Sequence, residues 1–311
     1  MKYGYGIDLG GTTVKLAFFQ EDGKMLHKWE IPTRKEESGK NILPDIAQAI
    51  LDHLAQTGIA KEDILGAGIC VPGPVMADGT VNICVNLGWG KFNVNQALSE
   101  LTGLTVRSGN DANVAALGES WLGGGQGCEN MVMVTLGTGV GGGIILDGKL
   151  LAGCHGCGGE IGHMVLHYDE TEKCGCGKQG CVEQYCSATG VVRMAKRKLA
   201  QTNADSVLRK ENLTCKDVFD GAAAADPVAL EVTEDFYEDM AKFLANICAV
   251  VDPEAIVIGG GVSKAGDVLL DGIRRHFPRH AFVGTRGVQF SLATLGNDAG
   301  ACGAFKLIMD N

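Results

Sequence analysis

The sequence lacks the features that would place this chain in a membrane or on nucleic acid. No segment approaches the run of about 20 apolar residues that a membrane-spanning helix needs. The start, MKYGYGIDLGG, lacks the basic segment and apolar run of a secretion signal. The net charge is −10, so the chain would release no counterions from a polyanion. We therefore expect a cytoplasmic protein with neither a membrane nor a nucleic acid as a partner.

Two common nucleotide-binding loops are also missing. The chain has no GxxxxGK[ST] sequence, and no GxGxxG sequence opens a helix. No period of 20–50 residues recurs, which argues against a solenoid. The chain does have 311 residues, 45% hydrophobic content and 46 clustered glycines. This composition indicates two domains with sizeable cores and several tight turns where backbone approaches a ligand.

Two strand–turn–strand segments organise the pattern. Strands are predicted at 3–8 and 14–19 around one turn, and at 131–136 and 144–146 around a second. A duplicated α/β fold with a cleft between its halves would produce this repetition. The remaining periodicity predicts strands at 64–71, 106–108 and 255–258, and helices at 41–56, 94–101, 112–121, 236–251 and 300–309.

The first turn carries a carboxylate, two glycines and two hydroxyls: Asp8, Gly10, Gly11, Thr12 and Thr13. Glycines allow backbone N–H groups to surround a phosphate, and threonine hydroxyls add donors. A carboxylate beside phosphates needs a cation, so Asp8 is a candidate for holding Mg²⁺ through water. The alternative is a glycine-rich hairpin in which Asp8 only stabilises the turn. The second copy at 136–143 favours a phosphate site.

A cluster of metal-binding residue types lies in the middle of the chain. His163, Cys174, Cys176 and Cys181 match a Cys₃His zinc site. Four protein ligands leave no open coordination position, so we expect a structural zinc ion that orders a glycine-rich loop. The alternative is a group of free cysteines. The other nine cysteines should be reduced thiols. The second C-x-x-C sequence at 154–157 could be redox-active or metal-binding, but it lacks a second pair of ligands, so we favour two unpaired thiols.

Carboxylates near these motifs suggest a site for a polyhydroxylated substrate. Phosphoryl transfer to a hydroxyl needs a carboxylate that accepts the proton, and we choose Asp111 for this role. The segment Asn110-Asp111-Ala112 could instead simply cap the helix that follows. Glu160 and Glu183 lie close in sequence to His163 and Cys181, so the zinc loop should bring both glutamates together. The acidic segment 164–173 should be a surface excursion.

Taken in order, these motifs resemble the ROK family and, within it, the bacterial ATP-dependent glucokinases. The resemblance covers nearly the whole chain. The segments that carry it are DLGGTT at 8–13, VPGP at 71–74, NLGW at 86–89, NDAN at 110–113, LGTGVGGG at 136–143, EIGH at 160–163, CGCGKQGCVE at 174–183 and GGGV at 259–262.

The resemblance implies an α/β, actin-like ATPase (ribonuclease H-like) duplicated fold, with two domains flanking an active-site cleft. On this basis we expect a small N-terminal domain of residues 1–118, completed by a C-terminal helix at 297–311. Residues 119–296 would form a large domain with the zinc-binding loop.

The resemblance also assigns roles to individual residues. It implies that Asp111 is the catalytic base and that the sugar is bound by Gly73, Asn86, Asn110, Asp111, Glu160, His163 and Glu183. His163 would place one ring nitrogen on zinc and the other on a sugar hydroxyl. The implied ATP-binding residues are Asp8, Gly10, Gly11, Thr12, Thr13, Thr138, Gly139, Gly259, Gly260 and Ser263.

The implied activity is ATP-dependent phosphorylation of a hexose at its 6-hydroxyl, with Mg²⁺ accompanying ATP. Glucose is the expected substrate, glycolysis the expected pathway, and a homodimer the expected assembly. The alternatives are a fructokinase, a mannokinase or an N-acetylated amino-sugar kinase. A ROK regulator without kinase activity would need a DNA-binding segment ahead of Asp8, for which we see no room. An actin-like ATPase would have no use for Glu160, His163 and Glu183.

Overall fold

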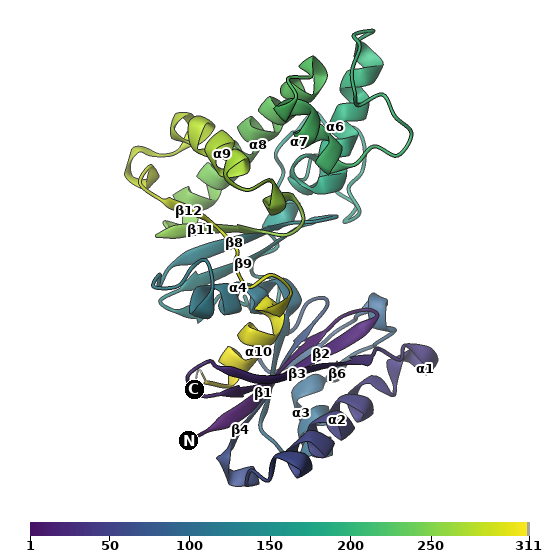
Figure 1. Cartoon of the computed structure of the whole chain (residues 1–311), viewed down its shortest axis with the longest axis vertical. Helices are drawn as coiled ribbons and strands as arrows, with labels where there is room; N and C mark the ends of the chain where they lie inside the picture. The colour runs from purple at the N-terminus through teal and green to yellow at the C-terminus, as the bar shows by residue number, and fades with distance from the viewer. Residues whose placement is uncertain (310–311) are drawn as a thin grey trace. The chain divides into compact units, whose positions relative to one another are not determined.

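The computed structural model describes residues 1–309, and the chain divides into two compact units (Figure 1). The first unit contains Met1–Glu129, Gly143–Gly159 and the chain from Leu295 onward. The second contains Asn130–Gly142 and Glu160–Thr294.

Two five-stranded sheets with the same internal order form the framework. Their orders are β3-β2-β1-β4-β7 and β10-β9-β8-β11-β12. In each sheet, three neighbouring strands run parallel: β1, β4 and β7 in one, and β8, β11 and β12 in the other. The strands are β1 Tyr3–Leu9, β2 Thr13–Gln20, β3 Met25–Pro32, β4 Ile64–Val71, β7 Val106–Asn110, β8 Met131–Leu136, β9 Val140–Leu146, β10 Lys149–Leu150, β11 Ala255–Gly259 and β12 Gln289–Leu292, with a small pair β5 Thr80–Val81 and β6 Phe92–Asn93. The matching orders support the duplication predicted from sequence.

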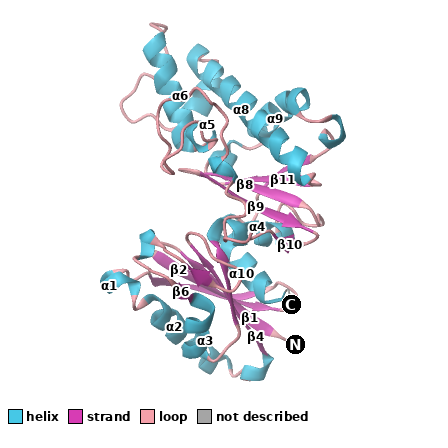
Figure 2. Ribbon diagram, turned by 180° about the vertical axis from the view of Figure 1, so that it is seen from behind, coloured by secondary structure: helices cyan, strands magenta, loops and turns pink. Residues whose placement is uncertain are grey.

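Helices cover these sheets (Figure 2). They are α1 Glu36–Gly39, α2 Ile42–Thr57, α3 Val94–Thr102, α4 Asp111–Leu122, α5 Glu183–Cys186, α6 Ala188–Gln201, α7 Cys215–Ala223, α8 Pro227–Val251, α9 Asp267–His280 and α10 Ala299–Met309. In the first unit, α2 and α3 lie on one side of the sheet, and α10 lies on the other (Figure 1). In the second unit, helices α6–α9 gather on one side of the sheet.

The C-terminal helix α10 packs directly on the first sheet because the strands beneath it carry glycines. A Cβ on Gly6 would lie 2.0 Å from the carbonyl oxygen of Ala301, and one on Gly68 would lie 1.6 Å from that of Ala304. No side chain fits in this space. The close contact ties the end of the chain to β1 and β4, whose carboxyl ends carry candidate site residues.

Each predicted element is present, and two of them begin several residues earlier than predicted. No element was predicted for β3, α6, α7, α9 or β12. β9 begins at Val140 rather than 144, so glycines predicted as turn residues belong to a strand. Gly143 is required there for packing, because its Cβ would lie 2.4 Å from that of Ala116. Helix α8 begins at Pro227, and the side chain of its N-cap residue Asp226 accepts a hydrogen bond from Ala229 N–H. An N-cap aspartate followed by proline at the first turn is a helix start that the apolar pattern missed.

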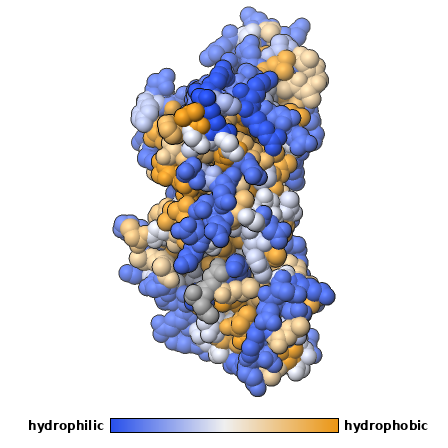
Figure 3. All heavy atoms as spheres, turned by 90° about the vertical axis from the view of Figure 1, so that its left-hand side faces the viewer, coloured by the Kyte–Doolittle hydropathy of each residue, from blue (hydrophilic) through white to orange (hydrophobic). Residues whose placement is uncertain are grey.

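The surface is mixed in character. The face in Figure 3 shows hydrophilic side chains interrupted by smaller apolar patches. Among residues 1–309, no helix combines the length and apolarity needed to span a bilayer.

Candidate functional site

The turn between β1 and β2 is a tight, exposed loop in the first unit. Gly10 N–H donates to the carbonyl of Thr13 at 3.1 Å, and Thr33 holds the turn from the side by donating to the carbonyls of Gly10 and Thr12. A Cβ on Gly10 would lie 2.8 Å from the Thr13 oxygen. Gly11 and Thr12 are exposed. The turn is thus pinned by its own backbone and leaves its tip open to a ligand.

Asp8 lies just before this turn and already faces a cation. Its Oδ2 is 3.2 Å from Lys15 Nζ, and its Oδ1 accepts a hydrogen bond from the Cys70 thiol at 3.2 Å. Burial, with the charges of Asp8 and Asp111, raises the pKa of Cys70 well above its usual value. The cation that the sequence argument required beside Asp8 is, in this structure, the Lys15 ammonium. A carboxylate at this edge also suits a Mg²⁺ ion that keeps most of its waters.

Asn110 and Asp111 occupy the junction between β7 and α4. Asn110 is the N-cap: its Oδ1 accepts from Asn113 N–H at 3.1 Å, and its Nδ2 donates to the Gly73 carbonyl at 3.0 Å. Asp111 is the first helical residue, exposed, with its Oδ1 accepting from Ala112 N–H at 2.8 Å. The segment therefore does cap the helix, as the alternative interpretation had it, and the capping side chain is that of Asn110.

Gly73 and Asn86 lie on two loops that are tied together. Gly73 has φ +101°, a conformation that favours glycine. Asn86 is exposed in a loop closed by paired backbone hydrogen bonds between Cys84 and Trp89. The Cys84 thiol donates to the Pro72 carbonyl at 2.8 Å, which links this loop to the Gly73 turn. Both predicted sugar-binding positions of this region therefore belong to one connected surface of the first unit.

In the second unit, the four predicted metal ligands converge. The ligand atoms of His163, Cys174, Cys176 and Cys181 all lie within 4.8 Å of one another. The sulfurs of Cys176 and Cys181 are 3.6 Å apart, close to the sulfur separation in a tetrahedral zinc site. Burial and the two neighbouring thiols raise the pKa of Cys181 to about 12, an effect that a bound cation would reverse. The donor set and its spacing fit Zn²⁺.

His163 and the two predicted glutamates surround this cluster. His163 Nδ1 lies 3.9 Å from the Cys174 sulfur, and its Nε2 lies 3.9 Å from Glu160 Oε2. The two ring nitrogens thus face different neighbours, as a double role for His163 requires. Glu183, the first residue of α5, lies with Oε1 3.4 Å from the Cys174 sulfur. The loop therefore brings Glu160 and Glu183 to the same cluster.

The turn between β8 and β9 contacts this cluster through Glu183. Glu183 Oε2 accepts a hydrogen bond from Val140 N–H at 3.1 Å. A Cβ on Gly139 would lie 2.2 Å from the same oxygen. The sequence did not predict this contact, because nothing in the spacing of residues 139 and 183 shows that they meet.

A third glycine turn follows β11 and lies beside the turn between β8 and β9. Gly259 pairs with Thr135 in the parallel register of β11 and β8, so both turns leave the same edge of the sheet. Gly260 has φ +84°, and a Cβ there would lie 2.5 Å from the Leu136 carbonyl oxygen. Ser263 Oγ donates to the Gly260 carbonyl at 2.8 Å. The predicted ATP-binding residues of the second unit, Thr138, Gly139, Gly259, Gly260 and Ser263, therefore gather at one edge of its sheet.

Comparison with known proteins identifies the family of this chain. The sequence profile of the ROK family matches residues 4–311. This chain belongs to the ROK family. A glucokinase of Halalkalibacterium halodurans is 43% identical over 309 residues, which cover 97% of this chain and 94% of that protein.

Two solved ROK structures share its fold. The ROK family glucokinase from Streptomyces griseus, in complex with glucose and AMPPNP, is 34% identical, with a TM-score of 0.73 over 99% of this chain and 100% of that one. The ROK hexokinase from Thermus thermophilus is 30% identical, with a TM-score of 0.82 over the same shares. The chain has the actin-like ATPase fold in two domains that ROK sugar kinases have.

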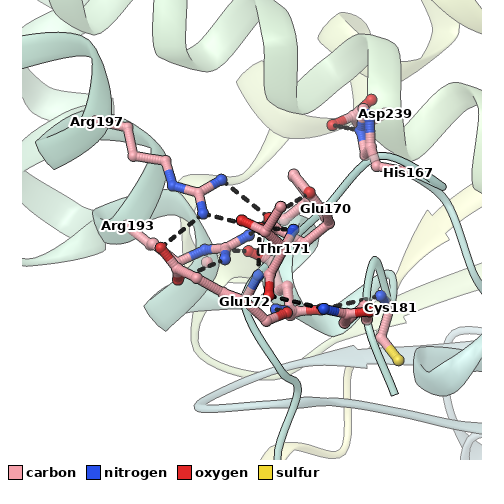
Figure 4. A network of polar contacts seen from close by, with 12 residues as sticks. His167, Glu170, Thr171, Glu172, Cys181, Arg193, Arg197 and Asp239 are labelled. Atoms are coloured by element: carbon pink, nitrogen blue, oxygen red, sulfur yellow. Dashed lines mark hydrogen bonds and ion pairs between the residues drawn. The ribbon is translucent and has the colours of Figure 1, made fainter. Parts of the chain in front are cut away.

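The acidic segment 164–173 of this ROK protein was expected to be a surface excursion, and one of its residues departs from that expectation. Residues 168, 169 and 171–173 are exposed, but the Glu170 side chain is only 2% exposed. It accepts hydrogen bonds from Arg193 at 2.9 Å and from Arg197 at 2.9 and 3.0 Å, both on α6, and from Tyr185 OH at 2.6 Å (Figure 4). The two arginines lie four residues apart on α6, but nothing in the sequence links them to Glu170, so local pattern could not predict its burial.

The Glu170 network extends to Cys181, one of the predicted metal ligands. Glu172 accepts a hydrogen bond through its carbonyl from Gln184 Nε2 at 3.0 Å, and Gln184 Oε1 accepts from Cys181 N–H at 3.1 Å. His167 is held by Asp239 of α8, with Nε2 2.9 Å from Oδ2 (Figure 4). The loop that carries the predicted metal ligands is thus held to α6 and α8 by side-chain hydrogen bonds and ion pairs that do not involve a metal ion.

Proposed function

We propose that this ROK protein transfers the terminal phosphoryl group of ATP to the 6-hydroxyl of glucose. The observation that carries the proposal is the likeness to glucokinases, at 43% identity across 97% of the chain. The sites described above supply the groups that this reaction needs. These are an exposed carboxylate at Asp111, polar groups around it, and two pinned glycine turns.

Asp111 would act as the general base. Its carboxylate is exposed at the start of helix α4. As the 6-hydroxyl oxygen attacks the terminal phosphorus, Asp111 would accept the hydroxyl proton. Asn110 is held in place by its bonds to Gly73 and Asn113, so it presents a fixed neighbour to the sugar.

The second unit would supply the remaining sugar ligands: Glu160, His163 and Glu183. Glu160 and His163 Nε2 face each other, and both can bind sugar hydroxyls. Gly73 and Asn86 would complete the sugar-binding set from the first unit. Mg²⁺ carried by ATP would neutralise phosphate charge, with Asp8 as its protein carboxylate.

The nucleotide would contact glycine turns of both units. Gly10, Gly11, Thr12 and Thr13 of the first turn and Thr138 and Gly139 of the second would surround the phosphates. Gly259, Gly260 and Ser263 would lie by the adenosine. A cytoplasmic homodimer serving glycolysis, with a small domain of residues 1–118 plus helix 297–311 and a large domain of residues 119–296, remains a prediction.

A hexose panel tests the proposed function. Purified protein with ATP and Mg²⁺ should release ADP fastest, at equal sugar concentration, with glucose. Mannose, fructose and N-acetylglucosamine serve as comparison substrates in the same enzyme-linked assay. If one of these sugars gives a higher kcat/KM than glucose, that sugar would be the preferred substrate. If the protein binds a sugar but releases no ADP with any of these hexoses, a regulator without kinase activity would be favoured instead.

Zinc is proposed as a structural ion held by His163, Cys174, Cys176 and Cys181. We expect Cys176→Ser to lower the zinc content of the purified protein and its thermal midpoint, because the ion closes a loop without a core of its own. Cys154→Ser, which removes an exposed thiol outside the cluster, is the matched control. Full zinc occupancy in Cys176→Ser, measured by elemental analysis, would contradict the assignment.

A further inference from the structure

Two thiols, Cys154 and Cys157, are exposed and lie outside the zinc cluster. All twelve cysteines lie within the described residues 1–309, and the other exposed one is the zinc ligand Cys176. Most of the rest are buried, and burial raises the pKa of Cys248 and Cys302 to about 11. Because the thiolate is the reactive form, such buried thiols react slowly. A reagent in solution would therefore meet Cys154 and Cys157 first.

The two thiols share one short, closed loop. Gly158 N–H donates to the Ala152 carbonyl at 2.8 Å and closes the loop at its base. Within it, the Cys154 sulfur lies 3.1 Å from His155 Nδ1, and the Cys157 thiol lies 3.5 Å from the His155 carbonyl oxygen. Both sulfurs thus contact the residue between them, and one of them touches a ring nitrogen that can take its proton.

The geometry argues against a preformed metal site at this loop. Among residues 1–309, the His163 cluster is the group in which three or more ligand atoms lie within 4.8 Å of one another. The donors of Cys154, His155 and Cys157 do not converge in this way. A nucleophile, a base and a second thiol in a short loop instead match the layout of thiol–disulfide exchange.

We propose that Cys154 and Cys157 form a site of reversible thiol–disulfide exchange with low-molecular-weight disulfides. His155 Nδ1 takes the Cys154 proton, and the sulfur attacks one sulfur of the disulfide RSSR. The RS–SR bond breaks, and the leaving RS⁻ takes up that proton as RSH. Cys157 then attacks the mixed disulfide on Cys154, its proton passing to the second leaving thiolate. Overall, two protein thiols are oxidised to one disulfide and RSSR is reduced to two RSH.

The loop is placed to affect sugar binding, a consequence that rests on the proposed function. Gly156 has φ +70°, and a Cβ there would lie 2.5 Å from the Val75 carbonyl oxygen. Val75 follows the Gly73 turn, and Glu160 lies three residues after Cys157. A new bond between Cys154 and Cys157 would constrain a loop that is packed against one proposed sugar-binding segment and continuous with another. Disulfide formation should therefore raise the KM for glucose more than it lowers kcat.

Peptide mapping tests the site without reference to activity. Zinc-loaded protein is incubated with glutathione disulfide and then alkylated, digested and analysed by mass spectrometry. We expect a Cys154–Cys157 disulfide that reduced glutathione removes. Cys157→Ser should accumulate the glutathione adduct on Cys154, because the second thiol is gone. His155→Gln should slow the first step. Absence of the disulfide, or an adduct that prefers Cys157, would overturn the assignment.

Kinetics test the consequence separately. The oxidised protein should show a KM for glucose raised by about tenfold, equivalent to about 1.4 kcal/mol, with its zinc content unchanged. Cys154→Ser/Cys157→Ser should keep its KM under the same oxidation. Loss of zinc, or an equal effect of oxidation on the double variant, would trace the change to the zinc thiols and overturn the regulatory role. If the protein has no hexose kinase activity, the kinetic measurement cannot be made. The peptide mapping would still show whether Cys154 and Cys157 exchange with a disulfide.

Discussion

Asp111 carries the proposed chemistry, and its surroundings separate its catalytic role from a structural one. Because Asn110 makes the capping hydrogen bond, Asp111 contributes to the helix start mainly through Ala112 N–H, which an asparagine can still bond. We expect Asp111→Asn to lower kcat by about 10²–10⁴-fold, because an amide cannot accept the hydroxyl proton. Steady-state kinetics with glucose and ATP measure the change.

Glucose affinity should change little in Asp111→Asn, and calorimetric titration with glucose checks this. Asp52→Asn provides the control, since Asp52 is an exposed carboxylate of α2 whose Oδ1 accepts from Gln48 at 2.7 Å. A kcat for Asp111→Asn within a few-fold of the unmodified protein would remove residue 111 from the mechanism.

The second glycine turn provides a matched pair of substitutions. A methyl group at Gly139 would meet Glu183 Oε2 at 2.2 Å, whereas one at Gly137 would meet nothing within 4 Å. Glu183 is a flexible side chain, so Gly139→Ala should fold but displace this proposed sugar ligand from its bond to Val140 N–H. We expect a raised KM for glucose in Gly139→Ala and near-normal kinetics in Gly137→Ala. Equal KM values for the two variants would argue against a role for Glu183 in sugar binding.

At the scale of elements, the loop with the predicted metal ligands depends on a buried carboxylate held by α6. Glu170 bonds Arg197, Arg193 and Tyr185, while Glu172 pairs with the same arginines but is 58% exposed. Removing one partner of a buried ion pair costs about 3–5 kcal/mol. We expect Glu170→Gln to lose about 3 kcal/mol of unfolding free energy, because both arginines keep access to water. Glu172→Gln should lose about 0–1 kcal/mol.

Denaturant unfolding followed at several pH values tests the charge of Glu170. Its hydrogen bonds with Arg197, more than offsetting burial, hold its pKa far below the ordinary value of 4.5. A depressed carboxyl pKa contributes stability above the unfolded-state pKa, and this contribution is lost as the pH falls toward the folded-state value. The deficit of Glu170→Gln should therefore be largest above pH 4.5 and shrink below it. A deficit that does not change with pH would show that Glu170 acts through packing alone.

The elements also show what local pattern could and could not predict. The strands β4 and β8 were predicted at their observed bounds, because each is a short apolar run between turn residues. The burial of Glu170 was not predicted, because the arginines that bind it lie more than twenty residues away in sequence. A run of acidic residues looks solvated unless the helix opposite it is known. Local pattern thus predicts elements, whereas burial of a charge depends on tertiary contacts.

At the scale of the whole chain, duplication explains how much of the site was foreseeable. Both sheets share one strand order, and each places a glycine turn after its first strand. The repetition is visible in sequence because phosphate-type turns need glycine wherever backbone must come close. The convergence of His163, Cys174, Cys176 and Cys181 was predictable from their spacing. The contact between Glu183 and Val140 N–H was not, since it joins a helix start to a turn in the folded unit.

The proposed sugar ligands are divided between the two units, and this division is testable as a property of the whole molecule. At 100 times its Kd, glucose should stabilise the protein by about 2.7 kcal/mol. Asn110→Ala in the first unit and Glu160→Gln in the second should each reduce this gain, because each removes a proposed ligand. Thermal unfolding with and without glucose measures the gain for each variant relative to its own ligand-free form, so any lost helix cap cancels. The controls are Asn41→Ala, whose side chain caps nothing, and Glu172→Gln. A full glucose effect in Glu160→Gln combined with its loss in Asn110→Ala would mean that the first unit binds the sugar without Glu160.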